Sequence, residues 1–221
     1  MAATIDKAMI INWALTEIGA GPMFSIEDES PLAQNIENTW QRTVDFAFGI
    51  DDWNWARRTV RLDRLAEVPE NGWRYGFDLP GDRIGPALAF LDQAGHSPRP
   101  LRQFHIEGKT VFANVPELWA EIRIIVAVDD WDVNFRAAFT KLLASELAIP
   151  VFQDKALKED LRTICLGQPH EKNTGGLFGR LMAQNKAAEP MGASPLMAAT
   201  PLDDARYSSG PGFMDWAGKY G

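Results

Sequence analysis

The clearest helical pattern in the chain lies between Trp131 and Leu166. Apolar side chains recur there at three- and four-residue spacing, as on one face of a helix: Phe135, Ala138, Phe139, Leu142 and Ile149. Asp132 is a predicted N-cap, and Pro150 is a predicted stop because proline disfavours the helical conformation in the residue before it. A second helix is predicted over residues 154–166, with three side chains buried: Leu157, Leu161 and Ile164. This helix pair is expected to form the core.

Glu146 interrupts the apolar face of the first of these helices. An unpaired charge is costly to bury, so its carboxylate must be paired, protonated or turned toward a partner surface. A structural ion pair or an exposed helix end is the simplest explanation, since perturbed carboxylates only sometimes mark sites. Glu146 is therefore expected to be a polar residue of the core.

Two helices are predicted near the N-terminus. The first spans residues 4–18 with Thr4 as its N-cap, and the second runs from Ser30-Pro31 to about Phe48. The first helix carries a second apolar stripe that ends in Trp13, so we expect it to contact another body as well as its own core. A last helix is predicted over residues 177–188.

The pattern changes from helical to alternating over residues 59–128, which predicts short strands and loops. Residues 102–106 and 110–115 flank Glu107-Gly108-Lys109, a hairpin signal. A further strand is predicted over residues 120–126. Three aromatic residues alternate earlier in this region and would share one face, as a core or an interface: Trp73, Tyr75 and Phe77.

Together these patterns predict a mainly helical α+β fold. An antiparallel helix-bundle core is expected from residues 1–50 and 130–189, with a β-rich module inserted over residues 51–129. Residues 190–221 are rich in Gly, Pro, Ala and Ser and carry isolated aromatic residues: Tyr207, Phe213, Trp216 and Tyr220. Such a segment cannot build its own core, so we expect an extended, flexible C-terminal tail that orders on a partner.

The composition of the chain narrows the range of functions that we expect for it. The chain has 221 residues, 46% hydrophobic and 24% charged, which is ordinary for a globular protein. A formal net charge of −8 argues against gripping nucleic acid through its phosphates. The single cysteine, Cys165, excludes an internal disulfide and is expected to fill the core. No apolar run reaches the length of a membrane span, and the N-terminus lacks the features of a signal peptide.

The sequence offers little catalytic chemistry. The three histidines are far apart, no His or Cys pair has metal-binding spacing, and no nucleophile or phosphate-loop motif is present. Asp51-Asp52, Asp129-Asp130 and Asp132 could bind a cation, but helix capping and turn formation explain them more simply. We therefore expect no enzyme activity, no metal and no cofactor.

Segments spread along the chain carry a family resemblance when they are taken in order. They are residues 11–19 (INWALTEIG) before the Ser30 helix, residues 53–58 (WNWARR) with Leu62, residues 72–82 (GWRYGFDLPGD), and residues 135–150 with Asp154. This order is similar to that of the tail tubular protein A family of short-tailed phages. Within the matching elbow, Trp55 takes the place of the family's phenylalanine. The sequence departs from the family pattern at Arg83, where a cysteine is common, and in the tail beyond residue 190.

The resemblance implies a structural virion protein at the head–tail interface, assembled in the bacterial cytoplasm without a membrane. Its partners would be further copies of itself in a dodecameric ring, the portal protein and the tail nozzle protein, with DNA passing through the channel without sequence-specific binding. Eight tryptophans suit a protein rich in interfaces. The predicted interface residues are Trp13, Trp53, Trp55, Trp73, Tyr75, Phe77, Tyr207, Phe213, Trp216 and Tyr220.

A second hypothesis comes from a different class. The chain could be a monomeric bacterial enzyme or regulatory domain whose site lies around Glu146 and the aspartate clusters. The mass in solution and a binding assay after removal of the tail would separate the two hypotheses.

Overall fold

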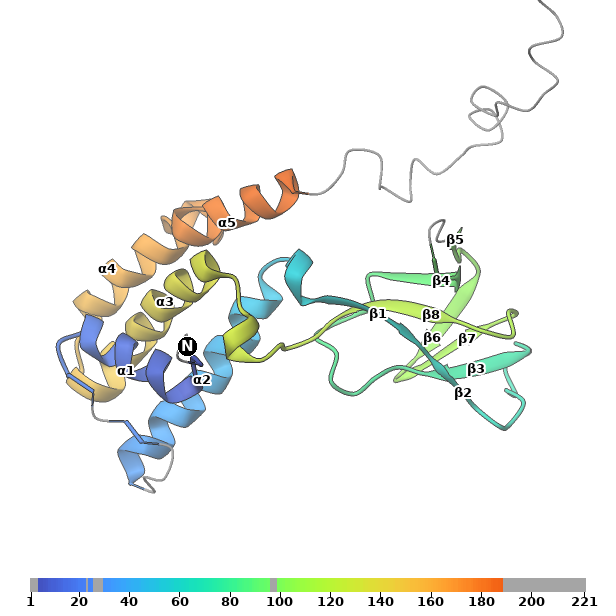
Figure 1. Ribbon diagram of the computed structural model, residues 1–221, viewed down its shortest axis with the longest axis horizontal. Coiled ribbons are helices and arrows are strands. Elements are labelled where there is room, and N and C mark those ends of the chain that lie inside the picture. The colour runs from blue at the N-terminus through green and yellow to red at the C-terminus, as the bar shows by residue number, and fades with distance from the viewer. Residues whose placement is uncertain (1–3, 23, 26–29, 96–98, 189–221) are drawn as a thin grey trace, which may run out of the picture. The chain divides into compact units, whose positions relative to one another are not determined.

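The computed structural model describes residues 4–22, 24–25, 30–95 and 99–188. Within these ranges the chain forms a mixed α+β fold with five α-helices and two antiparallel sheets (Figure 1). None of the helices in these ranges is long and apolar enough to cross a membrane. The predicted tail, with Tyr207, Phe213, Trp216 and Tyr220, lies outside the described residues.

The first two helices are α1 (Lys7–Glu17) and α2 (Pro31–Gly49). The predicted Thr4 cap of α1 is wrong: Asp6 caps the helix, because its carboxylate accepts a hydrogen bond from the Met9 N–H at 2.8 Å. The cap of α2 is confirmed, since Ser30 Oγ accepts from the Ala33 N–H at 3.2 Å, and Pro31 follows at the first helical position.

The next helices are α3 (Val133–Phe152) and α4 (Lys155–Leu166). Asp132 caps α3 and Asp154 caps α4. Their carboxylates accept hydrogen bonds from the N–H groups of Phe135 and Leu157, respectively. The stop at Pro150 is wrong. Pro150 lies in the last turn of α3, where it removes only one hydrogen bond of the helix, so the helix continues to its end at left-handed Gln153.

The remaining helical elements are α5 (Gly176–Ala187) and three 3₁₀ turns: η1 (Asn54–Ala56), η2 (Val128–Asp130) and η3 (Pro169–Glu171). The predicted boundaries of the last helix therefore agree with α5 to within one residue. The two turns η1 and η2 flank the strands, so the chain leaves and re-enters the helical region through short turns.

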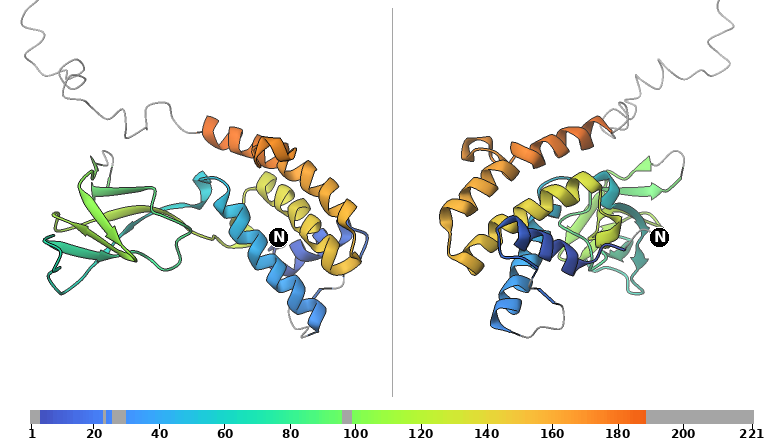
Figure 2. Two further views of the ribbon diagram at one scale, coloured as in Figure 1. Left: turned by 180° about the vertical axis from the view of Figure 1, so that it is seen from behind. Right: turned by 60° about the vertical axis from the view of Figure 1, so that its left-hand side comes forward.

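Helix α3 is at the centre of the helical region, because it packs against α1, α2 and α4 (Figure 2). Neighbours on several sides bury more of α3 than one stripe. Thr140 and Ser145, which are not part of the predicted apolar stripe, are buried, and their hydroxyls donate to carbonyls of their own helix. Conversely, Ile149 and Ile164 were predicted to be buried but are 37% and 52% exposed.

An aromatic cluster fills this helical core. Its rings come from α2, from the Trp53–Trp55 segment, from Trp131 between η2 and α3, from α3 itself and from α5: Trp40, Phe48, Trp53, Trp55, Trp131, Phe135, Phe139 and Phe178. Their mutual edge-to-face contacts contribute beyond the area that they bury. The cluster thus connects α2, α3 and α5 through one continuous set of side chains.

Two four-stranded antiparallel sheets lie between α2 and α3 in sequence. The first has the order β1-β8-β4-β5, from β1 (Arg57–Arg61), β8 (Trp119–Arg123), β4 (Ala89–Gln93) and β5 (Arg99–Pro100). The second has the order β2-β3-β7-β6, from β2 (Asp63–Arg64), β3 (Tyr75–Asp78), β7 (Thr110–Ala113) and β6 (Phe104–Glu107). The predicted hairpin is confirmed, as Glu107 pairs with Thr110 across Gly108, whose φ is +60°.

The strands have a hydrophobic core of their own, separate from the helical one. Among the described residues, these buried side chains belong to it: Leu62, Phe77, Leu79, Phe90, Val111, Ala113, Leu118, Ala120 and Ile122. At the boundary with the helical region, Arg57 of β1 pairs with Arg123 of β8, and the Ile124 N–H donates to the Ala56 carbonyl at 3.0 Å. The strands therefore form an insertion whose two ends meet in one antiparallel pair.

Candidate functional site

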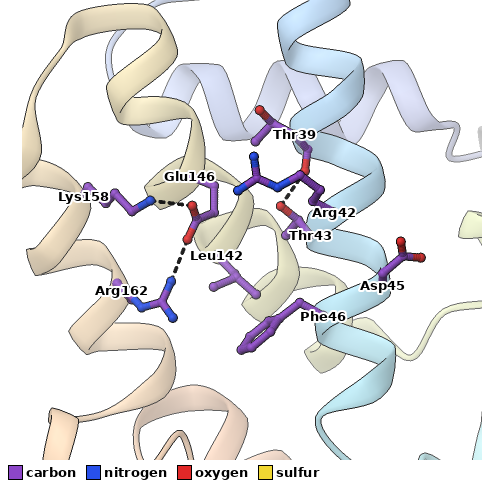
Figure 3. A pocket seen from close by; sticks show the side chains of 9 residues that line it. All are labelled: Thr39, Arg42, Thr43, Asp45, Phe46, Leu142, Glu146, Lys158 and Arg162. Carbon is purple, nitrogen blue, oxygen red and sulfur yellow. Dashed lines mark hydrogen bonds and ion pairs between the residues drawn. The ribbon is translucent and has the colours of Figure 1, made fainter. Parts of the chain in front are cut away.

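A pocket of about 490 Å³ is lined by residues of α2, α3 and α4 (Figure 3). Helix α2 supplies Arg42 and Phe46, and α3 supplies Glu146. Helix α4 supplies Lys158 and Arg162, which are four residues apart and therefore lie on one helix face. The packing of three helices thus brings both signs of charge and an aromatic ring to one place.

Glu146 is held by two ion pairs at this pocket. Lys158 Nζ lies 2.6 Å from Glu146 Oε2, and Arg162 Nη1 lies 2.7 Å from Glu146 Oε1. The Glu146 side chain is only 17% exposed. Of the alternatives that the sequence left open, the structure shows the first, a paired carboxylate. Both oxygens are engaged by cations, so Glu146 is a poor candidate for a general base.

Arg42 is a further cation at the pocket. Figure 3 shows its side chain extending from α2 into the space beside α3, whereas Asp45 points away from the ion pairs. Asp45 accepts a hydrogen bond from Gln41 Nε2 at 3.1 Å. Among the residues that the structure describes, no hydrogen bond or ion pair engages the Arg42 guanidinium. The pocket lining therefore holds three cationic side chains, two of which pair with Glu146.

The pocket also has an apolar wall. Phe46 is 37% exposed, and the Arg162 guanidinium lies 5.9 Å from its ring centre. Leu142 of α3 adds a buried aliphatic surface. Neither histidine nor cysteine lines the pocket, and the described part of the chain holds no group of His, Cys, Asp and Glu that could bind a metal. These residues could bind an anion that carries an apolar group next to its charge.

Replacing Glu146 with glutamine should lower the free energy of unfolding by about 1–2 kcal/mol, because two charge-assisted hydrogen bonds are lost at a partly buried position. Urea melts at low salt would measure the change. Glu117→Gln is the matched control, since the Glu117–Arg61 pair is exposed on both sides and should contribute less than about 0.5 kcal/mol. Equal losses for the two variants would show that the Glu146 pairs behave as surface pairs.

Two predicted interface residues are buried in hydrophobic cores of the chain itself, which corrects the sequence prediction. Trp53 is 2% exposed, and its Nε1–H donates to the Ala47 carbonyl at 2.9 Å. Phe77 is 1% exposed in the core of the sheets. The segment after α2 folds back onto the helices, and β3 turns Phe77 inward, so neither ring can reach a partner in this fold.

The other described aromatic residues of the predicted interface have some solvent exposure. Trp13 on α1 is 41% exposed. Trp55, Trp73 and Tyr75 are half-buried. The Trp55 ring nevertheless packs edge-to-face against Phe135, with 4.8 Å between the two ring centres, so Trp55 is mainly a core residue. Trp13 therefore remains the strongest of these candidates for contact with a partner.

The aspartate pairs have structural roles. Asp52 forms an ion pair with Arg57 at 2.7 Å, and its carbonyl accepts from Asn185 Nδ2 at 2.6 Å. Asn185 also accepts from the Asn54 N–H at 3.0 Å, so α5 is joined to η1 by side-chain hydrogen bonds. Asp129 Oδ1 accepts from the Ile5 N–H at 3.1 Å. Asp52 and Asp129 thus link separate segments of the chain, whereas the helix capping suggested by the sequence applies to Asp132 on α3.

Cys165 is buried in the helical core, and burial raises the pKa of its thiol from 9.0 to about 12. The folded state thus keeps the proton that the unfolded chain releases above pH 9, so the contribution of this thiol to stability is constant below pH 9 and falls as the pH rises toward 12. At pH 8 we expect the native thiol to react with iodoacetamide at least ~100-fold more slowly than in 6 M guanidinium, as thiolate is the reactive form. Mass spectrometry would follow the labelling, and comparable rates would contradict burial of the thiol.

Comparison with known proteins gives no further assignment: no model of a protein family matches the sequence, and no curated protein matches it.

Proposed function

We propose that the protein is a structural subunit of a phage head-to-tail adaptor, a ring that joins the portal to the tail nozzle. The observation that carries the proposal is the order of segments along the chain, from residues 11–19 through residues 53–58 and 72–82 to the 135–150 helix. In the structure these segments fall on α1, on the η1 turn before β1, around β3, and on α3. The finer architecture of the proposal is an antiparallel helix bundle with an inserted β-rich module and a docking tail.

Exposed apolar side chains on the helices support a role in assembly. Trp13 on α1, Val133 and Phe152 at the two ends of α3, and Ile164 on α4 are 41%, 72%, 49% and 52% exposed, respectively. Single exposed apolar residues are common on protein surfaces. Trp13, however, belongs to the second apolar stripe of its helix, and tryptophan is the residue type most enriched among energetically important interface positions.

The distribution of charge supports a DNA channel. Residues 1–56 contain nine acidic and only two basic side chains, so the N-terminal part of each subunit is strongly negative. A ring repeats this charge around its axis, and a negative surface repels the phosphates of passing DNA. The proposed ring would therefore conduct DNA without binding it.

The experiment that tests the proposal mixes the purified chain with portal rings from the phage that encodes it. Native mass spectrometry and negative-stain electron microscopy should show a ring of twelve copies attached to the portal. Trp13→Ala should weaken attachment and leave the thermal unfolding midpoint unchanged. Val68→Ala is the control, because Val68 is 79% exposed on a loop that the proposal does not use.

Removal of residues 190–221 tests the tail separately. The shortened chain should keep its helical circular dichroism and attach less well to the portal, as docking segments that order on binding do. Undiminished attachment would show that the tail is not a docking element. A chain that stays monomeric and binds no portal would overturn the adaptor proposal and favour the monomeric alternative.

A further inference from the structure

We propose that the pocket between α2, α3 and α4 binds an acidic side chain of a partner protein, presented next to an aromatic or aliphatic residue. The binding groups are Arg42, Lys158 and Arg162, and Phe46 contacts the apolar neighbour. This inference concerns the isolated subunit, and it holds whether or not the subunit belongs to an adaptor ring.

The excess of hydrogen-bond donors is the first argument. Each Glu146 oxygen takes one ion pair, whereas an arginine has five N–H donors and a lysine has three. Arg42 has no acceptor among the described residues, although its side chain extends into the pocket (Figure 3). A second carboxylate would match the unused donors of Arg42 and Arg162, and hydrogen bonds from arginine to carboxylate are among the strongest in proteins.

The type of anion follows from the charges that are already present. Glu146 at the pocket and Asp45 at its edge leave a single net positive charge among the five charged side chains of the lining. A monoanion neutralises this charge, whereas a phosphate dianion would exceed it. The net charge of −8 for the whole chain further disfavours a polyphosphate such as nucleic acid. The arrangement therefore selects a carboxylate.

The openness of the pocket favours a peptide over a free small acid. The side chain of Arg162 is 42% exposed, and Phe46 is 37% exposed, so a small molecule would keep much of its surface in water. Small-ligand sites usually bury most of the ligand. A peptide can place one acidic side chain in the pocket and cover the exposed Phe46 ring with the adjacent residue.

The test uses the full chain, labelled with ¹⁵N, and two tripeptide probes: acetyl-Phe-Glu-Phe-amide and its neutral analogue acetyl-Phe-Gln-Phe-amide. Titrations followed by amide and arginine side-chain signals should show at least roughly tenfold tighter binding of the glutamate peptide, the effect of losing one charged hydrogen bond. In Arg42→Gln this preference should disappear. The variant should fold normally, because Arg42 forms no ion pair with the described residues.

Arg180→Gln is the matched control, since Arg180 is exposed on α5 and does not line the pocket. It should retain the full preference for the glutamate peptide. Equal affinity of the two peptides for the unaltered chain would overturn the proposal, as would a preference that survives Arg42→Gln. A third probe, 3-phenylpropionate, distinguishes the source of the carboxylate: if it binds as tightly as the glutamate peptide, the site serves small acids, and the peptide proposal is wrong.

Discussion

Replacing Phe135 with alanine should lower the free energy of unfolding by about 3–5 kcal/mol, a large part of the roughly 5–15 kcal/mol that stabilises a typical domain. Phe135 is 1% exposed. Its ring contacts six other aromatic rings: Phe48, Trp53, Trp55, Trp131, Phe139 and Phe178. Alanine would leave a cavity at the point where α2, α3 and α5 meet, and close packing on all sides limits how far the neighbours can relax.

Urea denaturation followed by far-ultraviolet circular dichroism would measure this loss. Phe152→Ala is the matched control in the same helix, because Phe152 is 49% exposed and its truncation should cost less than about 1 kcal/mol. The loss of unfolding free energy for Phe135→Leu should lie between the losses for these two variants, since leucine refills part of the cavity. A loss for Phe135→Ala no larger than that for Phe152→Ala would show that the ring cluster is not the stabilising core of the helices.

Phe77→Ala should destabilise the sheets by about 3–5 kcal/mol and leave the helical region largely intact. Phe77 is 1% exposed and belongs to the core of the sheets, and within the described part of the chain this core shares no buried side chain with the core of the helices. The cavity therefore weakens contacts among the strands alone. Local opening of one cooperative unit is the expected result.

Hydrogen exchange with mass spectrometry separates the two regions. In Phe77→Ala, amides of β3 and β7 should exchange much faster, whereas those of α3 should keep their protection. Trp73→Ala serves as the comparison, because Trp73 is half-buried just before β3 and its loss should affect exchange far less. If amide exchange in α3 accelerated as much as in β3 and β7, the separation of the two cores would be contradicted.

Local signals predicted the elements well where the physical cause is local. Ser30 and Asp132 cap helices as expected, because a side-chain oxygen needs only the N–H groups two or three residues away. Asp154, where the next helix was predicted to begin, caps α4 in the same way. The hairpin around Gly108 follows from a short loop that requires a positive φ. Pro150 misled the prediction, since a proline in the last turn costs one hydrogen bond and the packing of α3 outweighs it.

Burial was harder to predict because it depends on elements that are distant in sequence. The alternation of Tyr75 and Phe77 shows that they share a face of β3, but only the sheets determine that Phe77 is covered. Ile164 has the spacing of a core residue, yet it remains 52% exposed among the elements that the structure describes. Trp53 was predicted to contact a partner because the sequence does not show that the chain after α2 folds back onto the helices and buries this ring.

The candidate site was predictable only in part. The phase of Glu146 indicated that it needed a partner, and the four-residue spacing of Lys158 and Arg162 on the next helix offered two cations on one face. Neither helical phase nor residue spacing pointed to Arg42. It is more than a hundred positions from Glu146 in sequence, and only the packing of α2 against α3 brings it to the pocket.

The antiparallel pair at the ends of the insertion has a consequence for protein engineering. Paired Cα atoms in such a ladder are only about 4.5–5.5 Å apart, so the gap between Arg57 and Arg123 is short enough for a tight turn to bridge. Deleting the intervening residues and joining the two ends through Asn-Gly would yield a miniature helical protein. The excised segment, with its own apolar interior, is equally suited to transplantation into a loop of an unrelated scaffold.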